Sequence, residues 1–421
     1  MTTTTRAHDP IDLSSLAFWT GHPAEREPIF DLLRRERPVS WHRPAESGLL
    51  PEPDPDDPGY WALVRHADIV AVSRDSETWG SGMEYGGVMM ENVPEEILEM
   101  AHSILSMDAP RHTTLRKVIS SVFTPRRVKL IEDQIKAQAA AIVDDLGEHG
   151  EVDLVETVSG RLPMWTISEM IGVPEEERQV VTDAANAMVG WNDEDFIGDS
   201  DPLQMMFDAL LVLHGRAYDL CQARAAHPQD DLFSALVQAE VDGAKLTFEE
   251  IAAFFVLLSV AGNDTTRQTT THGVLALDRH PDQKKLLMED FEARIGPAVE
   301  EFVRWGTPVL TFRRTARKDA QIGGQLIAAG EKVVMFYHSA NRDETVFADP
   351  YTLDITRNPN PHVGFGGGGA HFCLGSNVAR TQLRAIFDQL LHRLPDLQVT
   401  GEPEFLAGNF INGIKRLPVR Y

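Results

Sequence analysis

The stretch PHVGFGGGGAHFCLGSNVARTQL, residues 361–383, decides the fold of this chain. Five of its glycines precede Cys373, which is one of only two cysteines among 421 residues. Glycine adopts positive φ at little cost and lets a flat ligand approach the backbone closely. After the cysteine, apolar residues recur at steps of three and four, which predicts an amphipathic helix. These residues are Leu383, Ile386, Phe387, Leu390, Leu391 and Leu394.

Cys373 is therefore predicted to lie where a glycine-rich loop becomes a helix N-terminus. Unpaired N–H groups and the positive end of the helix dipole stabilise a thiolate at such a position. A thiolate ligates metals, so the pattern favours a metal-binding cysteine. Cys221 has no such setting and fits better as a small buried apolar side chain.

The glycines also spell a G-x-G-x-x-G at Gly364, Gly366 and Gly369, with Asp388 near the position of a ribose-binding acid. A dinucleotide-binding loop of this kind must follow a buried strand. Here residues 357–362 read RNPNPH, and Asp388 falls inside the predicted helix. Dinucleotide binding is therefore disfavoured.

Phe365, Gly369, His371, Cys373 and Gly375 resemble the haem-binding signature of the cytochrome P-450 haem-thiolate monooxygenases. An extra residue lies between Phe365 and Cys373, and His371 stands where most members have arginine. Both features resemble a bacterial subgroup that oxidises branched lipids and sterols. The resemblance covers roughly the whole chain. It implies a mainly α fold with small β-sheets and haem b between a long central helix and the cysteine-loop helix, with the Cys373 thiolate as axial ligand.

Composition supports one soluble unit. No linker-like shift, repeat or low-complexity block divides the chain, so residues 1–421 are predicted to form a single domain. The formal charge of −25, from 39 basic and 64 acidic residues, disfavours nucleic-acid binding. Two cysteines cannot form a disulfide framework. The N-terminus has no apolar core for a signal peptide, and residues 251–262 are too short to span a membrane. A cytoplasmic location with no transmembrane segment is expected.

The periodicity along the chain predicts mostly helices with a few short strands. Residues 79–109 carry no clear pattern, and a capping signal at Thr247–Glu250 opens the most apolar helix. Helices are expected at residues 25–37, in a segment through Ile69, Val70 and Val72, and at 232–277, with two more before Thr307. Residues 126–226 are expected to be nearly all helical, with breaks at 147–150, 172–174 and 198–202. Strands are expected at residues 60–64, 308–314, 321–327 and 333–337, with a returning hairpin at 405–421.

The sequence AGNDTT, residues 261–266, interrupts that apolar helix. Polar side chains there are costly unless they face a partner. Thr265 can hydrogen-bond the carbonyl of Ala261, and with Gly262 beside it the helix can open locally. An ordinary helix cap with Gly262 as a breaker is the alternative. The pattern resembles the oxygen-binding kink of the P-450 central helix, which implies that Asp264 and Thr265 relay protons during oxygen activation.

Glu301 and Arg304 are spaced as an ordinary i,i+3 ion pair. Together with Arg357 they resemble the buried Glu-Arg-Arg triad of the family, which implies a structural role in holding the cysteine loop.

His112 and Arg116 lie one helical turn apart and could form a solvated helix face. Arginine suits carboxylates through its fork geometry. The resemblance implies that His112, Arg116, Arg314 and His371 hold the haem propionates.

Methionines and aliphatic residues crowd residues 83–107, and such walls accommodate flexible apolar ligands but also fill ordinary cores. By resemblance, the pocket is lined by uncharged positions, so the substrate is expected to be hydrophobic: Leu257, Val260, Ala261, Val309 and Phe410. The most similar members are actinobacterial hydroxylases of methyl-branched lipids, with sterol side-chain hydroxylases close behind. Terminal or near-terminal hydroxylation of a branched lipid, fatty acid or terpenoid chain is expected.

The resemblance implies a monooxygenase that uses O2 and electrons from a ferredoxin and its NAD(P)H reductase. A basic patch at Arg126, Arg127, Arg380 and Arg384 is a candidate docking surface for an acidic ferredoxin, or simply a solvated surface. The alternatives are a peroxide-driven haem enzyme, which Asp264 and Thr265 disfavour, and a non-catalytic haem or lipid carrier.

Overall fold

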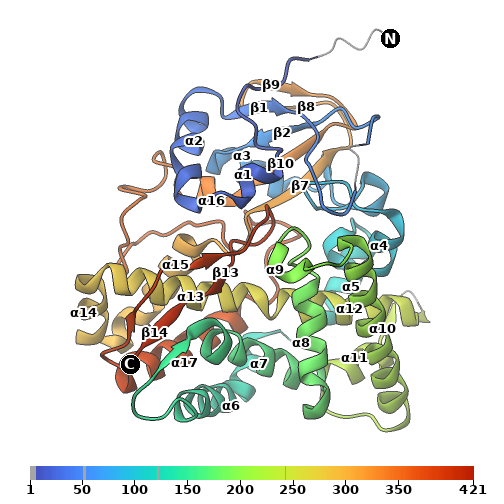
Figure 1. The fold of residues 1–421 in the computed structure, drawn as a ribbon. Helices are drawn as coiled ribbons and strands as arrows, with labels where there is room; N and C mark the ends of the chain where they lie inside the picture. Colours follow the sequence, from blue (N-terminus) through green and yellow to red (C-terminus); the bar gives the residue numbers. More distant parts are fainter. Residues whose placement is uncertain (1–5, 51–53, 121–122, 242) are drawn as a thin grey trace.

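The computed structural model describes residues 6–50, 54–120, 123–241 and 243–421. Helices fill the lower part of the molecule in Figure 1, and the largest sheet lies in the upper part. The prediction of a mainly α fold with small sheets is confirmed. The helices are α1 (Leu16–Thr20), α2 (Pro23–Glu36), α3 (His66–Arg74), α4 (Glu95–Met100), α5 (Arg111–Ser120), α6 (Pro125–Asp144), α7 (Arg161–Ile171), α8 (Arg178–Ala187), α9 (Glu194–Ile197), α10 (Pro202–Ala226), α11 (Leu232–Gln238), α12 (Phe248–Ala261), α13 (Asp264–Arg279), α14 (Pro281–Glu289), α15 (Phe291–Gly306), α16 (Tyr337–Ala340) and α17 (Ser376–Arg393).

The largest sheet has helices on both faces. Alternate residues point to opposite faces of a strand, so Tyr60 and Phe336 pack with α1 and α2 while Trp61 and Met335 pack with α3. Because both faces are covered, β2 and β10 are buried along their whole length, and all their residues except Lys332 are apolar. β10 pairs in parallel with β2, and the other pairs are antiparallel. The strand order is β1 (Val39–His42), β2 (Tyr60–Leu63), β10 (Lys332–Phe336), β7 (Thr311–Ala316) and β3 (Trp79–Gly80).

Smaller sheets attach to the helical part. β14 pairs with both β11 and β4, so the C-terminus is joined to the segment after α6. The remaining strands form two-stranded units. The small-sheet strands are β4 (Glu151–Asp153), β5 (Glu240–Val241), β6 (Ala244–Lys245), β8 (Ala320–Ile322), β9 (Gln325–Ile327), β11 (Gln398–Val399), β12 (Glu404–Phe405), β13 (Ile414–Arg416) and β14 (Pro418–Arg420).

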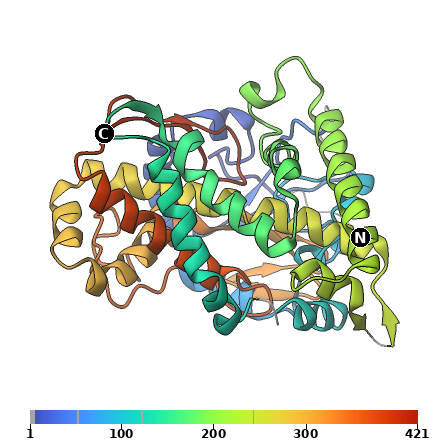
Figure 2. The ribbon, with the colours of Figure 1, turned by 90° about the horizontal axis from the view of Figure 1, so that it is seen from below.

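Two apolar cores flank the central helices. One joins α13, α15 and α17 through residues such as Phe302 and Phe387, whose rings lie 4.6 Å apart. The other joins α8, α10 and α12. α17 packs along α6, and Figure 2 shows the two helices crossing in red and teal. The helix after Cys373 is thereby held on several sides.

Most predicted elements are confirmed, including α2, α3, β2, the capping box at Thr247 and Glu250, and the apolar face of α17. Three expectations need correction. Residues 79–109 contain β3, α4 and two short 3₁₀ turns. Glu240–Val241 and Ala244–Lys245, expected to be helical, pair as the antiparallel strands β5 and β6. The C-terminal hairpin is confined to β12 and β13, because β14 leaves it to pair with β4.

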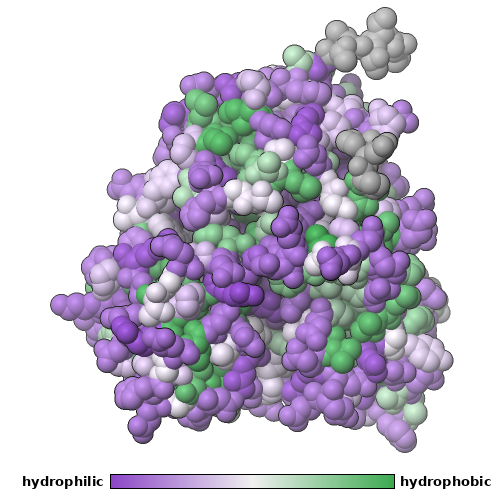
Figure 3. Space-filling model, in the orientation of Figure 1, coloured by the Kyte–Doolittle hydropathy of each residue, from purple (hydrophilic) through white to green (hydrophobic). Residues whose placement is uncertain are grey.

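The surface is largely hydrophilic, as Figure 3 shows for one face and as the net charge leads one to expect. The exposed apolar side chains include several on α10, namely Phe207, Leu211, Val212 and Tyr218. Within the described residues, no helix combines the length and apolar character needed to cross a bilayer.

Candidate functional site

Cys373 lies in a loop three residues before α17, as the sequence predicts. Its N–H donates to the carbonyl of Phe365 at 2.9 Å, which closes residues 365–373 into a compact loop. The N–H groups of Gly375 and Ser376 and the charge of Arg116 lower the pKa of the Cys373 thiol, but burial outweighs them and raises it. A metal bound to the sulfur would remove the proton outright.

The glycines of this loop serve two different needs. Gly369 has φ of +77°, and a Cβ there would lie 2.2 Å from the carbonyl oxygen of Ser73 in α3. The close approach at Gly369 is therefore made by α3 and not by a ligand, which corrects the sequence interpretation at that position. Gly375 behaves differently, since a Cβ there would face open space. The side of the loop after Cys373 has room for a flat ligand.

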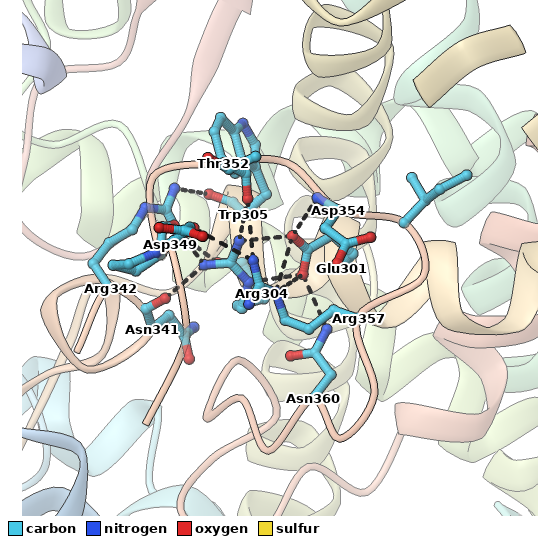
Figure 4. Close-up of polar contacts among 12 residues, drawn as sticks. Glu301, Arg304, Trp305, Asn341, Arg342, Asp349, Thr352, Asp354, Arg357 and Asn360 are labelled. Carbon is cyan, nitrogen blue, oxygen red and sulfur yellow. Dashed lines mark hydrogen bonds and ion pairs between the residues drawn. The ribbon is translucent and has the colours of Figure 1, made fainter. Parts of the chain in front are cut away.

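The cysteine loop is tied to α15 by a buried carboxylate. The carboxylate of Glu301 accepts two hydrogen bonds of 2.7 Å from Arg304, and both residues are 0% exposed. Glu301 also accepts from Arg357 at 3.2 Å and from Asn360 at 3.1 Å, both in the segment leading to Cys373 (Figure 4). Arg304 in turn donates to the carbonyls of Asn341 and Pro350. The three residues singled out in the sequence are thus brought together.

A second glutamate of α15, next to Glu301, also bonds to residues on either side of Cys373 and was not predicted from the sequence. Glu300 accepts from Arg380 of α17 at 2.6 and 3.0 Å, and it lies 3.0 Å from Nε2 of His362. Arg380 and His362 hold the pKa of Glu300 down at about 2 despite burial. Glu300 and Glu301 are adjacent in α15. One turn of this helix therefore bonds both the segment before Cys373 and α17, which follows it. Only the i,i+3 pair had a sequence signal.

Two arginines and two histidines meet beside the cysteine loop. The rings of His112 and His371 lie 4.4 Å apart. Burial and the positive charges of Arg314 and Arg116 lower the pKa of His371 to about 2, so all four groups share one small region. Arg116 also donates to the carbonyl of Phe372.

The two arginines carry the positive charge of this group, because the pKa values of His112 and His371 are lowered. Arg314 is buried, and burial lowers its pKa. Its NH1 donates to the carbonyl of Arg313 at 2.7 Å, and within the described parts of the chain no carboxylate forms an ion pair with it. Nε2 of His112 is buried without a partner there. Buried cations need anions or acceptors, so the group suits a ligand that carries carboxylates.

The central helix is interrupted where the sequence predicts it. α12 ends at Ala261 and α13 begins at Asp264. The hydroxyl of Thr265 donates to the carbonyl of Ala261 at 3.0 Å. Ala261 is exposed although the helices around it are buried, so there is accessible space at the notch. The small apolar side chain of Ala261 can line this space without a hydrogen-bond partner.

Asp264 faces away from water. It is 3% exposed, and burial raises the pKa of its carboxyl although Arg267 attracts the charged form. Arg267 lies 3.3 Å from Oδ1 of Asp264 and donates to Asn186 of α8 at 2.8 Å. The spacing of Asp264 and Arg267 permits this pair, but nothing in the sequence predicted Asn186.

The apolar positions expected to line a pocket come together around Phe410. Val260, Val309 and Phe410 belong to one cluster, and Leu257 packs in the neighbouring core with Phe410. A bridge between Val309 and Ile411 joins the two backbone segments. The methionine-rich segment contributes to two separate cores. Met107 packs in the helical core, whereas Met90 packs against the large sheet. Cys221 packs at the edge of the helical core, and burial raises its pKa to about 11.

A family model described as Cytochrome P450 matches residues 204–403. The Methyl-branched lipid omega-hydroxylase of Mycobacterium tuberculosis is 42% identical over 415 residues, which cover 98% of this chain and 94% of that protein. This chain belongs to the cytochrome P450 family. It is therefore a monooxygenase of a family whose cofactor is a haem with a thiolate ligand, and which takes O2, redox partners and a hydrophobic substrate.

Two further relatives of this P450 sharpen the comparison. The Steroid C26-monooxygenase of Mycolicibacterium smegmatis is 40% identical over 402 residues, covering 94% of this chain and 91% of that protein. A solved Mycobacterium marinum cytochrome P450 in complex with pseudoionone is 55% identical, with a TM-score of 0.96, and 99% of each chain is covered. The P450 fold expected from the cysteine motif is thus confirmed.

Proposed function

We propose that this P450 hydroxylates a terminal or near-terminal C–H bond of a methyl-branched lipid, fatty acid or terpenoid. The proposal places the enzyme in the cytoplasm and gives it electrons from a ferredoxin and its NAD(P)H reductase. The observation that carries the substrate class is the uncharged cluster of Val260, Val309 and Phe410. The 42% identity with a Methyl-branched lipid omega-hydroxylase supports the same class.

In this proposal Cys373 ligates the iron of haem b, and four side chains hold the propionates: His112, Arg116, Arg314 and His371. Ala261, Phe365 and Gly375 lie against the porphyrin. Support comes from Arg116 and Arg314, which form no ion pair within the described residues, and from the unpartnered Nε2 of His112. The open side of Gly375 and the exposure of Ala261 support it as well. When bound, a thiolate-ligated haem supplies the activation of O2 and the insertion of one oxygen atom into a C–H bond.

Asp264 and Thr265 supply protons in this proposal. Burial raises the pKa of the Asp264 carboxyl and so favours its protonated form, and Arg267 fixes the orientation of that carboxyl. The Thr265 hydroxyl is held at the notch by its bond to Ala261. Glu301, Arg304 and Arg357 act structurally by holding the cysteine loop.

Leu257, Val260, Ala261, Val309 and Phe410 form the substrate wall in this proposal. A sterol side chain is the second candidate, because the 40% identical relatives are named Steroid C26-monooxygenase. Both substrates present a methyl-branched apolar end. The two candidate substrates differ in the size of the group attached to that end, which is a flexible chain in one and a sterol ring system in the other.

The proposed ferredoxin surface contains Arg126, Arg127, Arg380 and Arg384. Arg127 pairs with Asp230 at 3.3 Å, Arg380 pairs with Glu300, and Arg384 pairs with Glu292. These pairs reduce the local positive potential, so we expect weak and salt-sensitive docking.

Optical titration tests the substrate proposal directly. Pseudoionone, phytanic acid and cholesterol are added separately to the holoenzyme, and the Soret band is followed for the low-spin to high-spin change. A response to the first two, followed by terminal hydroxylation with a ferredoxin system, is expected. A response to cholesterol alone would select the sterol candidate, and a response only to small polar ligands would reject both.

The cofactor proposal has its own test. Cys373→Ser should abolish the thiolate spectrum of the reduced carbonyl complex, and survival of that spectrum would mean that another ligand binds the iron. Turnover with hydrogen peroxide but not with a ferredoxin system would favour the peroxide-driven alternative. Binding without any turnover would favour a carrier.

A further inference from the structure

Glu91 is a buried carboxyl group that lies outside the proposed catalytic machinery. It is 1% exposed. One carboxyl oxygen accepts from the indole N–H of Trp191 at 3.1 Å, and the other accepts from the side-chain amide of Asn409 at 3.2 Å. Burial raises the pKa of Glu91, and Arg313 attracts its charged form only from a distance. An apolar side chain would be cheaper to bury here.

The three residues join segments that are far apart in the chain. Glu91 precedes α4, Trp191 lies between α8 and α9, and Asn409 lies in the turn between β12 and β13. The segment that carries Glu91 is bonded to β7, because the side chain of Arg313 donates to Oδ1 of the neighbouring Asn92 at 2.9 Å. The N–H of Arg313 also donates to the carbonyl of Val88 at 2.8 Å.

Both partners of Glu91 determine where Phe410 lies. Asn409 directly precedes Phe410 in the chain. The ring of Trp191 stacks on the ring of Phe410, with centroids 5.9 Å apart and planes 29° apart. Phe410 also packs against Phe312, with ring centroids 5.8 Å apart. A shift of either partner of Glu91 would therefore move the Phe410 ring.

A second buried carboxylate ties the same two segments together. Asp193 is 2% exposed and accepts from the N–H of Ala407 at 2.8 Å and from Nζ of Lys415 at 3.0 Å. Apolar contacts tolerate sliding, whereas hydrogen bonds require particular distances and angles. The polar contacts of Glu91 and Asp193 thus define the position of the turn that carries Phe410.

We propose that Glu91 is a positioning residue that fixes the Phe410 ring through Trp191 and Asn409, and so sets how far a hydrophobic substrate can reach into the pocket. Glu91 itself does not touch the substrate. The inference rests on the proposed function only in that Phe410 lines the pocket. The position of the Phe410 ring would then determine which apolar ligands bind, according to their size, and which carbon of a bound ligand is oxidised.

The test compares Glu91→Leu, Glu91→Gln and Trp191→Phe in the holoenzyme. The chain offers a matched control in Glu331, which accepts from the indole N–H of Trp61 at 2.9 Å at the edge of the large sheet. Dissociation constants for pseudoionone and phytanic acid are measured by optical titration, products are identified, and thermal unfolding is followed for every variant.

Glu91→Leu is expected to change the ratio of the two dissociation constants by about tenfold, the equivalent of one buried hydrogen bond. It should also spread oxidation to carbons further from the chain end. Glu91→Gln keeps one acceptor and should lie in between. Trp191→Phe should act in the same direction, and the double variant should add little to either single change. Glu331→Leu should leave both ratio and products unchanged.

An unchanged ratio and unchanged products in Glu91→Leu, with or without lower thermal stability, would overturn the inference. An equal change in Glu331→Leu would overturn it as well. If Glu91→Leu does not fold, Trp191→Phe decides alone, because it removes the donor and leaves an aromatic, though smaller, ring beside Phe410. The ratio of dissociation constants requires no turnover, so a failure to hydroxylate either lipid would reject the proposed function without touching this inference.

Discussion

The hydroxyl of Thr265 donates a 3.0 Å hydrogen bond to the carbonyl of Ala261, across the gap that separates α12 from α13. A side chain that bonds the carbonyl four residues back competes with the helix ladder and bends the helix. Here the bond coincides with an exposed Ala261 at the centre of otherwise buried helices. The interruption of the central helix and the bond that accompanies it are therefore both local to residues 261–265.

Thr265→Ala should uncouple NAD(P)H consumption from product formation, because the notch loses the hydroxyl that we propose passes protons. Product per NAD(P)H should fall several-fold and hydrogen peroxide should rise, while Thr265→Ser should stay close to the native ratio. The matched control is Thr269→Ala, since Thr269 makes the same backward bond to the carbonyl of Thr265 at 2.9 Å. Equal uncoupling in both alanine variants would assign the effect to helix geometry.

Removing Arg304 should destabilise the protein far more than removing a surface arginine. Arg304 and Glu301 are both 0% exposed, and breaking one side of a buried pair costs about 3–5 kcal/mol. Arg304→Leu should therefore lower the free energy of unfolding by about that amount and reduce haem content. Arg384→Leu, which removes a half-exposed partner of Glu292, should cost less than about 1 kcal/mol. Urea unfolding of both variants provides the comparison.

Much of this site could be predicted because its parts are local in the sequence. The notch is contained in residues 261–266, the pair Glu301 and Arg304 spans one helical turn, and the cysteine loop directly precedes its helix. The capping box at Thr247 is equally local, and it begins α12 as expected.

The side-chain contacts that the sequence did not predict are all long-range. Glu300 meets Arg380 across 80 residues, and Glu91 meets Asn409 across 318 residues. No periodicity encodes which distant donor reaches a buried carboxylate. The β5–β6 hairpin was missed for another reason, because strands of two residues are too short to show an alternating pattern.

Arg314→Leu should weaken haem retention while leaving the fold intact. Arg314 is buried, and its side chain donates to the carbonyl of Arg313. Among the residues that the structure describes, no carboxylate forms an ion pair with it, so its charge is available to a propionate. Loss of one charged hydrogen bond corresponds to about 10- to 100-fold faster haem release. The rate of haem transfer to apomyoglobin measures this without any turnover. Arg393→Leu, which removes a surface pair with Asp144, should release haem at the native rate.

Stability should fall as the pH drops from about 6.5 to 4, and His272 should contribute to that loss. His272 lies on α13, with Nε2 2.8 Å from the carbonyl of Asn412, and burial lowers its pKa from 6.5 to about 4. The unfolded chain therefore takes up a proton below about pH 6.5 that the folded chain refuses until about pH 4, so this contribution is complete above 6.5. His272→Gln keeps a donor for Asn412 but cannot titrate. The difference in unfolding free energy between pH 7 and pH 5 should shrink in this variant, and an unchanged difference would show that other groups, such as His42 with its pKa lowered to about 4, carry the acid sensitivity.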